Sequence, residues 1–251
     1  PGVKRGGEGQ NGMFVRGGSG DDNLILLDEA VVYNISHLFG FFSVFNNDAL
    51  KDVTLIKGGF PAKYGGRLSS VMDIRMKEGD LQHFHAEGGV GLLSSHLTIQ
   101  GPIKKDAASF IISGRRSYID QVFKLAYGGK NVLPYYFYDL TGKINYRLSN
   151  KDRFFFSTYF GDDVLSASTK NDSLLVEGGF NLGNFTTTLR WNHVYNPKLF
   201  SNISLIHTRF RYDVEGSGLG NSFLVKSSIK DIGVKMDFDY FRNPRNRISY
   251  G

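Results

Sequence analysis

The sequence feature that most limits the fold is a strict alternation of apolar and polar residues in the second half of the chain. In "YFYDLTGKINYRL" one face of an extended chain would carry Tyr136, Tyr138, Leu140, Ile144, Tyr146 and Leu148, and the other Asp139, Thr141, Lys143, Asn145 and Arg147. "NFTTTLRWNHVY" and "DIGVKMDFDY" repeat the pattern. Because successive side chains of a β-strand point to opposite sides, this period of two predicts strands with one apolar and one polar face.

The connections between these strands favour a membrane barrel over a soluble sandwich. Short connections ("SNKD", "NPK", "NPRN") alternate with long ones ("IDQVFKLAYGGKNVLP", "GDDVLSASTKNDSLLVEGG", and the intermediate "VEGSGLGNS"). Outer-membrane barrels have short periplasmic turns and longer extracellular loops. Tyr146, Tyr195 and Tyr240 precede the three short turns, where an aromatic girdle would lie. A sandwich differs in one testable respect, because its apolar strand faces would pack against one another.

The composition excludes several other classes of protein. Among 251 residues there are 21 Phe and 13 Tyr, an abundance that favours strands, and there is no Cys to form disulfides or Cys-based zinc sites. The net charge is +6, but acidic residues separate the basic ones, so nucleic acid is not predicted as a partner. The sequence has no run of 18 apolar residues, so a membrane-spanning helix is not predicted. The chain starts in mid-motif, and we expect it to be a fragment or a processed form.

The first 80 residues differ from the rest in being rich in glycine and in short strands. The expected strands lie in "MFVRGG", "NLILLDEAVVY", "DVTLIKGG" and "SSVMDIRM". "FNNDALKDVTLI" predicts one short helical turn capped by Asn47 or Asp48. "KGGFPAKYGG" predicts a built turn between two strands, because Gly permits positive φ and Pro fixes its own φ. The residues that form this structural corner are Gly58, Gly59, Pro61, Tyr64, Gly65 and Gly66.

This segment closely resembles the plug domain of TonB-dependent outer-membrane receptors. The resemblance rests on "VRGG", "LLDEAVVY" and "KGGFPAKYGG" in that order, and "EGGVGLLSSHLTIQGPI" continues it into a barrel start. It implies a mostly β fold with a small α+β plug, followed by antiparallel transmembrane β-barrel strands. Residues 1–80 would be an N-terminally truncated plug domain. Residues 81–251 would be about eight or nine strands of a barrel that is incomplete in this chain.

The resemblance also implies a function and partners. The parent protein would be a receptor and transporter in the outer membrane of a Gram-negative bacterium, taking up a scarce or large substrate with energy from the TonB–ExbB–ExbD complex. The segment that contacts TonB would be absent from this chain. Outer-membrane lipids, an unknown imported ligand and a surface lipoprotein are the other expected partners. The alternatives are a soluble β-rich binding module and a signal-transducing or secretion-associated receptor.

Candidate site residues come from the same resemblance. Arg16 and Lys57 stand where the family carries basic plug residues that pair with glutamates of the barrel wall; the alternative is two solvated charges. His37 lies in an aromatic plug loop that, by resemblance, faces the ligand, although simple packing is the alternative. The aromatic residues of that loop are Phe39, Phe41 and Phe42.

Neither an enzyme nor a cofactor site is predicted. No Ser-His-Asp arrangement or pair of catalytic carboxylates stands out. "GEGQNG" (residues 7–12) matches a dinucleotide fingerprint in letters, but a short β run follows it where a helix is required. His83 and His85 share one face of an expected strand, and a metal would need a third ligand that the sequence does not identify. The prediction is therefore no metal site.

Overall fold

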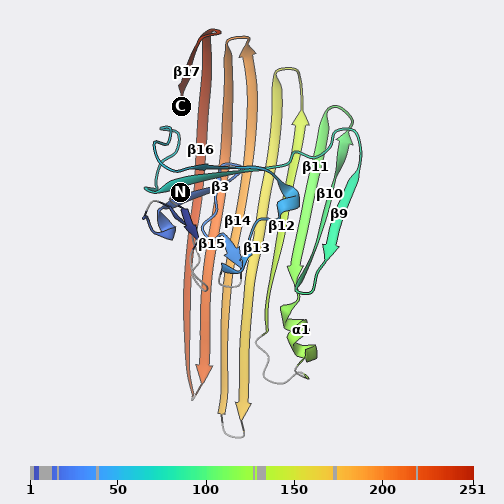
Figure 1. The fold of residues 1–251 in the computed structure, drawn as a ribbon, viewed down its shortest axis with the longest axis vertical. Coiled ribbons are helices and arrows are strands. Elements are labelled where there is room, and N and C mark those ends of the chain that lie inside the picture. The colour runs from blue at the N-terminus through green and yellow to red at the C-terminus, as the bar shows by residue number, and fades with distance from the viewer. Residues whose placement is uncertain are drawn as a thin grey trace.

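The computed structural model describes residues 3–5, 13–15, 17–37, 40–126, 128, 134–171, 174–218 and 220–251. The chain has two parts, which lie against each other in Figure 1. We call the part up to residue 80 the plug region and the nine-stranded sheet that follows it the wall. The predicted fold class is confirmed: the chain is mostly β, with an unclosed antiparallel sheet in its second part.

The wall strands follow one another in chain order, each antiparallel to the next. They are β9 (His85–Val90), β10 (Ser94–Lys104), β11 (Ala108–Ser117), β12 (Tyr135–Arg147), β13 (Asp152–Asn171), β14 (Leu174–Asn196), β15 (Leu199–Gly218), β16 (Asn221–Asn243) and β17 (Asn246–Tyr250). Helix α1 (Ile119–Ala126) lies in the connection between β11 and β12. The short turns lie at one end of the wall and α1 lies at the other (Figure 1). Among the described residues, no helix is long and apolar enough to cross a membrane.

Two of the predicted loops are strands. The stretch "GDDVLSASTKNDSLLVEGG" continues β13 as far as Asn171 and begins β14 at Leu174, and these two residues are paired. In "VEGSGLGNS", Gly218 of β15 likewise pairs with Asn221 of β16. The physical reason is that each added pair of an antiparallel hairpin continues the backbone hydrogen-bond ladder, even where the side chains no longer alternate.

The two faces of the wall have opposite surroundings. Leu140 is 50% exposed and Val234 is 62% exposed on the apolar face, whereas Asp139, Thr141 and Lys143 on the polar face of β12 are buried. The plug region covers that polar face. A soluble sandwich would bury the apolar faces against each other, so the sandwich alternative is wrong for this chain.

The plug region is built on a four-stranded sheet in the order β4-β3-β8-β7. Its strands are β3 (Asn23–Leu27), β4 (Ala30–Val31), β7 (Leu50–Ile56) and β8 (Ser70–Met76), and β3 runs parallel to β8. The smaller elements are the pairs β1 (Val3–Arg5) with β2 (Met13–Val15) and β5 (Ser36–His37) with β6 (Phe42–Ser43), and the 3-10 helices η1 (Gly20–Asp22) and η3 (Asn47–Ala49). Tyr159 of β13 packs into the plug core beside Ile25, Leu27, Ile74 and Met76. The core of the plug region is therefore completed by the wall.

Two local predictions for the plug region are corrected. "NLILLDEAVVY" is not one strand, because Asp28 (φ +44°) and Glu29 (φ +77°) turn the chain between β3 and β4. The cap of η3 is Asn46, whose side chain accepts from the backbone N–H of Asp48 at 3.3 Å, one residue before the predicted caps. The predicted domain boundary at residue 80 falls between the end of β8 at Met76 and the start of β9 at His85. The division of the chain into two domains at this boundary stays a prediction.

The glycine-rich corner connects β7 to β8. Gly58, Gly59 and Gly66 take positive φ values of 125°, 62° and 81°. Between them the backbone N–H of Tyr64 donates to the carbonyl of Pro61 at 3.0 Å. Tyr64, like Ile56 at the end of β7, packs against the buried cluster of Leu24, Leu26 and Val71. These contacts fold the segment back so that β7 and β8 can pair.

Candidate functional site

The candidate site is the interface between the plug region and the polar face of the wall. Three side chains of the plug region, Asp28, Glu29 and His37, reach charged residues of the wall strands. Because one partner of each contact belongs to the plug region and the other to the wall, these contacts decide how the plug region is seated.

His37 on β5 lies between two wall carboxylates. Its Nε2 is 2.8 Å from Oδ1 of Asp139 on β12, and its Nδ1 is 2.7 Å from Oδ2 of Asp163 on β13. Its ring stacks on Phe137, with centroids 4.2 Å apart and planes 7° apart. Only 2% of His37 is exposed. The histidine is therefore a buried polar bridge from the plug region to two adjacent wall strands.

The surroundings of His37 favour its protonated form. A neutral imidazole has one N–H, but both ring nitrogens here face carboxylate oxygens, which accept hydrogen bonds and do not donate them. Burial of the ring opposes protonation, yet the hydrogen bonds and charges of Asp139 and Asp163 outweigh it and raise the pKa of His37. Arg115 supplies a second positive charge through its guanidinium, 2.5 Å from Asp139 Oδ2. Two positive and two negative groups thus balance within one buried network.

Two hydroxyl groups complete this network. The Tyr159 hydroxyl donates to Asp139 Oδ1 at 2.9 Å, and the Tyr135 hydroxyl donates to Asp163 Oδ1. Arg115 also donates to the backbone carbonyl of Ser43 on β6 at 2.5 Å. Both strands of the β5–β6 pair are therefore bonded to the wall.

The second contact is a buried ion pair between Asp28 and Lys143. Lys143 Nζ on β12 lies 2.8 Å from Asp28 Oδ2, and the two side chains are 3% and 4% exposed. The Nζ also donates to the Met76 carbonyl at 3.3 Å, while the Met76 N–H donates to Asp28 Oδ1 at 3.2 Å. Both charges are shielded from water and held against the end of β8. Removing either partner would leave the other charged group buried without its counter-charge.

Glu29, the next residue of the same turn, reaches three more wall strands. It accepts from Asn202 Nδ2 at 3.0 Å and from the Ser204 hydroxyl, both on β15. Arg190 on β14 and Lys235 on β16 lie 4.0 and 3.9 Å from its Oε1. The Asp28–Glu29 turn therefore brings two acidic side chains of the plug region to a basic part of the wall.

Further polar contacts extend the interface on both sides of this turn. Arg153 on β13 pairs with Glu78 at 2.7 Å, at the end of the plug region. Asn184 on β14 donates to the Asn34 carbonyl at 3.0 Å, and the Tyr33 hydroxyl donates to Asp231 on β16. The wall contributes polar partners from β11 to β16, and this explains why its polar face is buried.

Among the residues that were predicted from the resemblance and that the structure describes, His37 is the one that takes part in the hydrogen-bonded network. Arg16 and Phe39 lie outside the described residues. Lys57 is half-buried and has no ion pair within the described part of the chain. Phe41 is exposed, and Phe42 packs at 5.4 Å from the ring of Phe137. The ligand-facing role of the His37 loop stays a prediction, and His37 itself is buried against the wall.

The acidic turn Asp28–Glu29, which makes two of the three contacts, was not predicted from the sequence. The available signal was the pair Asp28–Glu29 inside an otherwise apolar run, together with basic residues on the polar faces of the alternating strands. Lys143, Arg190 and Lys235 hold such positions. Charges at the centre of an apolar run need counter-charges when they are buried, which is the physical reason to search for partners across the fold.

The wall is an unclosed antiparallel sheet with an apolar outer face, and a smaller region with its own sheet lies on its polar inner face. This arrangement is that of a plugged β-barrel, of which the wall forms one part. Residues 1–70 match the family model described as TonB-dependent Receptor Plug Domain. The resemblance to the plug domain of TonB-dependent receptors that was drawn from the sequence is therefore confirmed for this part of the chain.

Three solved structures are similar to this chain, and OprC is the one among them with a TM-score above 0.5. The copper transporter OprC is similar over 99% of this chain and 49% of its own, with a TM-score of 0.53 and 12% identity. A mutant of the ferric enterobactin receptor PfeA from Pseudomonas aeruginosa is similar over 99% of this chain and 52% of its own, with a TM-score of 0.49 and 13% identity. The siderophore receptor PirA from Acinetobacter baumannii is similar over 97% of this chain and 55% of its own, with a TM-score of 0.47 and 13% identity.

At these identities the likeness concerns the fold. The chain spans about half the length of the solved structures that it matches. The search of curated protein sequences gave no match.

Proposed function

We propose that this chain is part of an energised outer-membrane importer, in which the plug region closes the lumen of a barrel completed by further strands. The division proposed is plug domain for residues 1–80 and barrel strands for residues 81–251. The observation that carries the proposal is the seating of a receptor-type plug on the polar face of a sheet whose other face is apolar. A transporter of this kind has no catalytic step, and we expect no enzymatic activity.

The contacts of the plug region give a physical reason for an energy source. Opening a path beside the plug region would separate His37 from Asp139 and Asp163, and Asp28 from Lys143. Separating a buried pair without supplying other partners costs ~3–5 kcal/mol, because each charge remains in a poorly hydrated site. Thermal motion alone would then open the path rarely. Mechanical work by the TonB–ExbB–ExbD complex on the plug domain would supply the missing energy.

The proposed place of the wall is the outer membrane of a Gram-negative bacterium. Its apolar side chains would face lipid tails, and Tyr146, Tyr195 and Tyr240 would lie at the inner interface, next to the short turns. These three tyrosines are exposed near that end of the wall. An imported ligand and a surface lipoprotein partner are proposed on the family resemblance alone. No substrate class is favoured.

Membrane fractionation of the full-length protein tests the proposal. We expect the protein in the outer-membrane fraction after separation by density. We also expect its mobility in gel electrophoresis to change when the sample is heated, as it does for a stable barrel. In the same preparation, a purified periplasmic domain of TonB should retain it. Recovery as a soluble periplasmic or cytoplasmic protein would overturn the localisation. Recovery in the outer membrane without retention by TonB would overturn the energised mechanism.

A further inference from the structure

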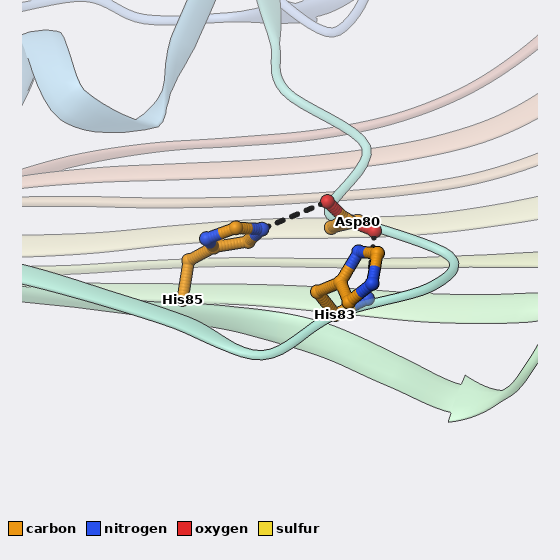
Figure 2. A group of neighbouring side chains, drawn as sticks. All are labelled: Asp80, His83 and His85. Carbon is orange, nitrogen blue, oxygen red and sulfur yellow. Dashed lines mark hydrogen bonds and ion pairs between the residues drawn. The ribbon is translucent and has the colours of Figure 1, made fainter.

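The segment that joins the plug region to the wall brings together three side chains that can bind metal. Asp80, His83 and His85 lie between β8 and the start of β9, and one ligand atom from each lies within 4.8 Å of the other two. Figure 2 shows both imidazole rings turned toward the Asp80 carboxylate. All three side chains are accessible to solvent. The third ligand that the sequence left unidentified is therefore Asp80, which lies three residues before His83.

The local sequence explains why the two histidines share a side. In an extended chain His83 and His85 point one way and Phe84 points the other. The Phe84 ring covers Gly101 of β10, where a larger side chain would overlap it, and lies 6.2 Å from the ring of Phe110 on β11. Packing of Phe84 on the wall thus fixes the side on which the histidines stand.

Asp80 is held in position by its own neighbours. Its Oδ1 accepts from the backbone N–H groups of Gln82 at 2.6 Å and His83 at 3.0 Å, and its Oδ2 lies 2.9 Å from His85 Nε2. These backbone hydrogen bonds, and then the contact with His85, lower the pKa of Asp80 to about 2. The two backbone hydrogen bonds therefore fix the position of the carboxylate. Gly79, at φ +80°, lies so close to the Phe110 carbonyl that a side chain there would overlap it.

We propose that Asp80, His83 and His85 bind one divalent transition-metal ion, with Zn²⁺ as the best-matched occupant. Two imidazole nitrogens and one carboxylate oxygen form a usual zinc donor set, and water would complete the coordination. This donor set also suits Cu²⁺ and Ni²⁺, whereas Mg²⁺ and Ca²⁺ prefer oxygen ligands. Ligand atoms around tetrahedral zinc lie about 3.4 Å apart, so the present spacing needs only side-chain rotation.

The position of this site gives the ion a structural role. The connecting segment is tied to the turn between β10 and β11, because the Gln82 amide donates to Asp106 and the Asp106 N–H donates to the Leu81 carbonyl at 3.3 Å. A metal ion would add a second tie, between the end of the plug region and the first wall strand. This inference concerns an ion held at the joint and is independent of the proposed import function.

Zinc titration of the full-length receptor tests the site. The receptor is purified in detergent without a polyhistidine tag, treated with EDTA and titrated with ZnCl₂ against a fluorescent chelator. We expect one equivalent to bind in the wild type and at least a tenfold weaker Kd in the His83→Gln/His85→Gln double variant. His207→Gln is the matched control, since this wall histidine lies away from the cluster, and its Kd should equal that of the wild type.

X-ray absorption at the zinc edge gives a second readout. We expect two imidazole ligands at about 2.0–2.1 Å in the wild type and fewer in His83→Gln alone, which keeps the contact between Asp80 and His85. Equal affinity in the wild type and the double variant would overturn the proposal. A spectrum with no imidazole ligand would also overturn it.

Discussion

Two tight turns of the plug region differ in the polar contacts that they make with the wall, although the Tyr64 ring of the second lies 6.0 Å from Lys235 Nζ on β16. The Asp28–Glu29 turn is acidic and contacts wall strands β12, β14, β15 and β16 through ion pairs and hydrogen bonds. The Gly58–Gly66 corner is flanked by Lys57 and Arg67, contains the exposed Lys63, and has no ion pair among the described residues. Both turns use positive φ, but only the first uses residues other than glycine to do so.

This difference shows which turn seats the plug region. Asp and Glu in a left-handed conformation are less stable than Gly there, and such strain persists only where surrounding contacts maintain it. The contacts of Asp28 and Glu29 with the wall supply that stabilisation. The glycine corner does not require stabilisation by the wall, because glycine adopts positive φ without strain. The corner connects β7 to β8. We infer that plug seating depends on the acidic turn and on His37 far more than on the corner.

The largest effect is expected from Lys143→Met. It removes one charge of a buried pair and leaves the Asp28 side chain buried without its counter-charge, at a cost of ~3–5 kcal/mol in the free energy of unfolding. Urea unfolding of the full-length receptor in detergent, followed by protease susceptibility of the plug region, measures it. The double variant Asp28→Asn/Lys143→Met should recover most of the loss, since neither charge remains. A single variant that loses under about 1 kcal/mol would show that the pair does not seat the plug region.

The next effect is a pH dependence due to His37. Its folded-state pKa is raised, so the stability that it contributes is fully present below the unfolded pKa of about 6.5 and is lost as pH rises through the folded pKa. The plug region should therefore become easier to unfold with urea as the pH rises above 6.5. In His37→Gln that contribution should disappear, so the gap between variant and wild type should narrow with rising pH.

The groups that face His37 define the control for this prediction. They are Asp139, Asp163, Arg115, Tyr135 and Tyr159. His207→Gln removes a wall histidine whose Nδ1 contacts only the Asp231 carbonyl, and it should keep the wild-type pH profile. A gap between His37→Gln and wild type that stays constant from pH 6 to pH 9 would contradict a protonated His37.

Glu29→Gln should have a smaller effect. Its two basic neighbours are at 3.9 and 4.0 Å, and its hydrogen bonds come from neutral groups, so we expect a loss of about 1 kcal/mol. Glu87→Gln is the control: it removes an exposed carboxylate, 3.8 Å from Lys77, and should leave the unfolding free energy within about 0.5 kcal/mol of wild type. Indistinguishable results for the two variants would mean that Glu29 is an ordinary surface charge.

The sequence predicted the parts of the fold that depend on periodic patterns. The alternation along β12, β14 and β16 identified the strands and which of their faces would be exposed, because that information is local. The acidic turn could not be found in this way. Asp28 and Lys143 are 115 positions apart, and their contact exists only once the plug region lies on the wall. The contacts of Asp139 and Asp163 could not be predicted for the same reason. These two residues are far apart in the sequence, yet both contact the imidazole ring of His37.

The full lengths of β13 and β14 could not be predicted from the sequence either. The extensions of β13 and β14 beyond the alternating segments carry Gly, Ser, Asp and Asn, which are common in loops. Pairing with a neighbouring strand overrides that local preference, since the ladder satisfies the backbone groups of both strands at once. The cluster of Asp80, His83 and His85 was missed for a similar reason, and no metal site was predicted. Strand alternation placed His83 beside His85, but the bend at Leu81 and Gln82 that brings Asp80 to them is not visible in that pattern.

The smallest effect is expected from Lys57→Ala, at the corner. Lys57 is half-buried and lacks an ion pair among the described residues, so its loss should change the free energy of unfolding by less than about 0.5 kcal/mol. Lys63→Ala, in the same corner and exposed, is the matched control and should give the same result. If Lys57 pairs with a glutamate elsewhere in the barrel wall, as the family resemblance implies, Lys57→Ala would cost ~3 kcal/mol or more while Lys63→Ala would not. That outcome would show that the basic corner seats the plug region together with the acidic turn.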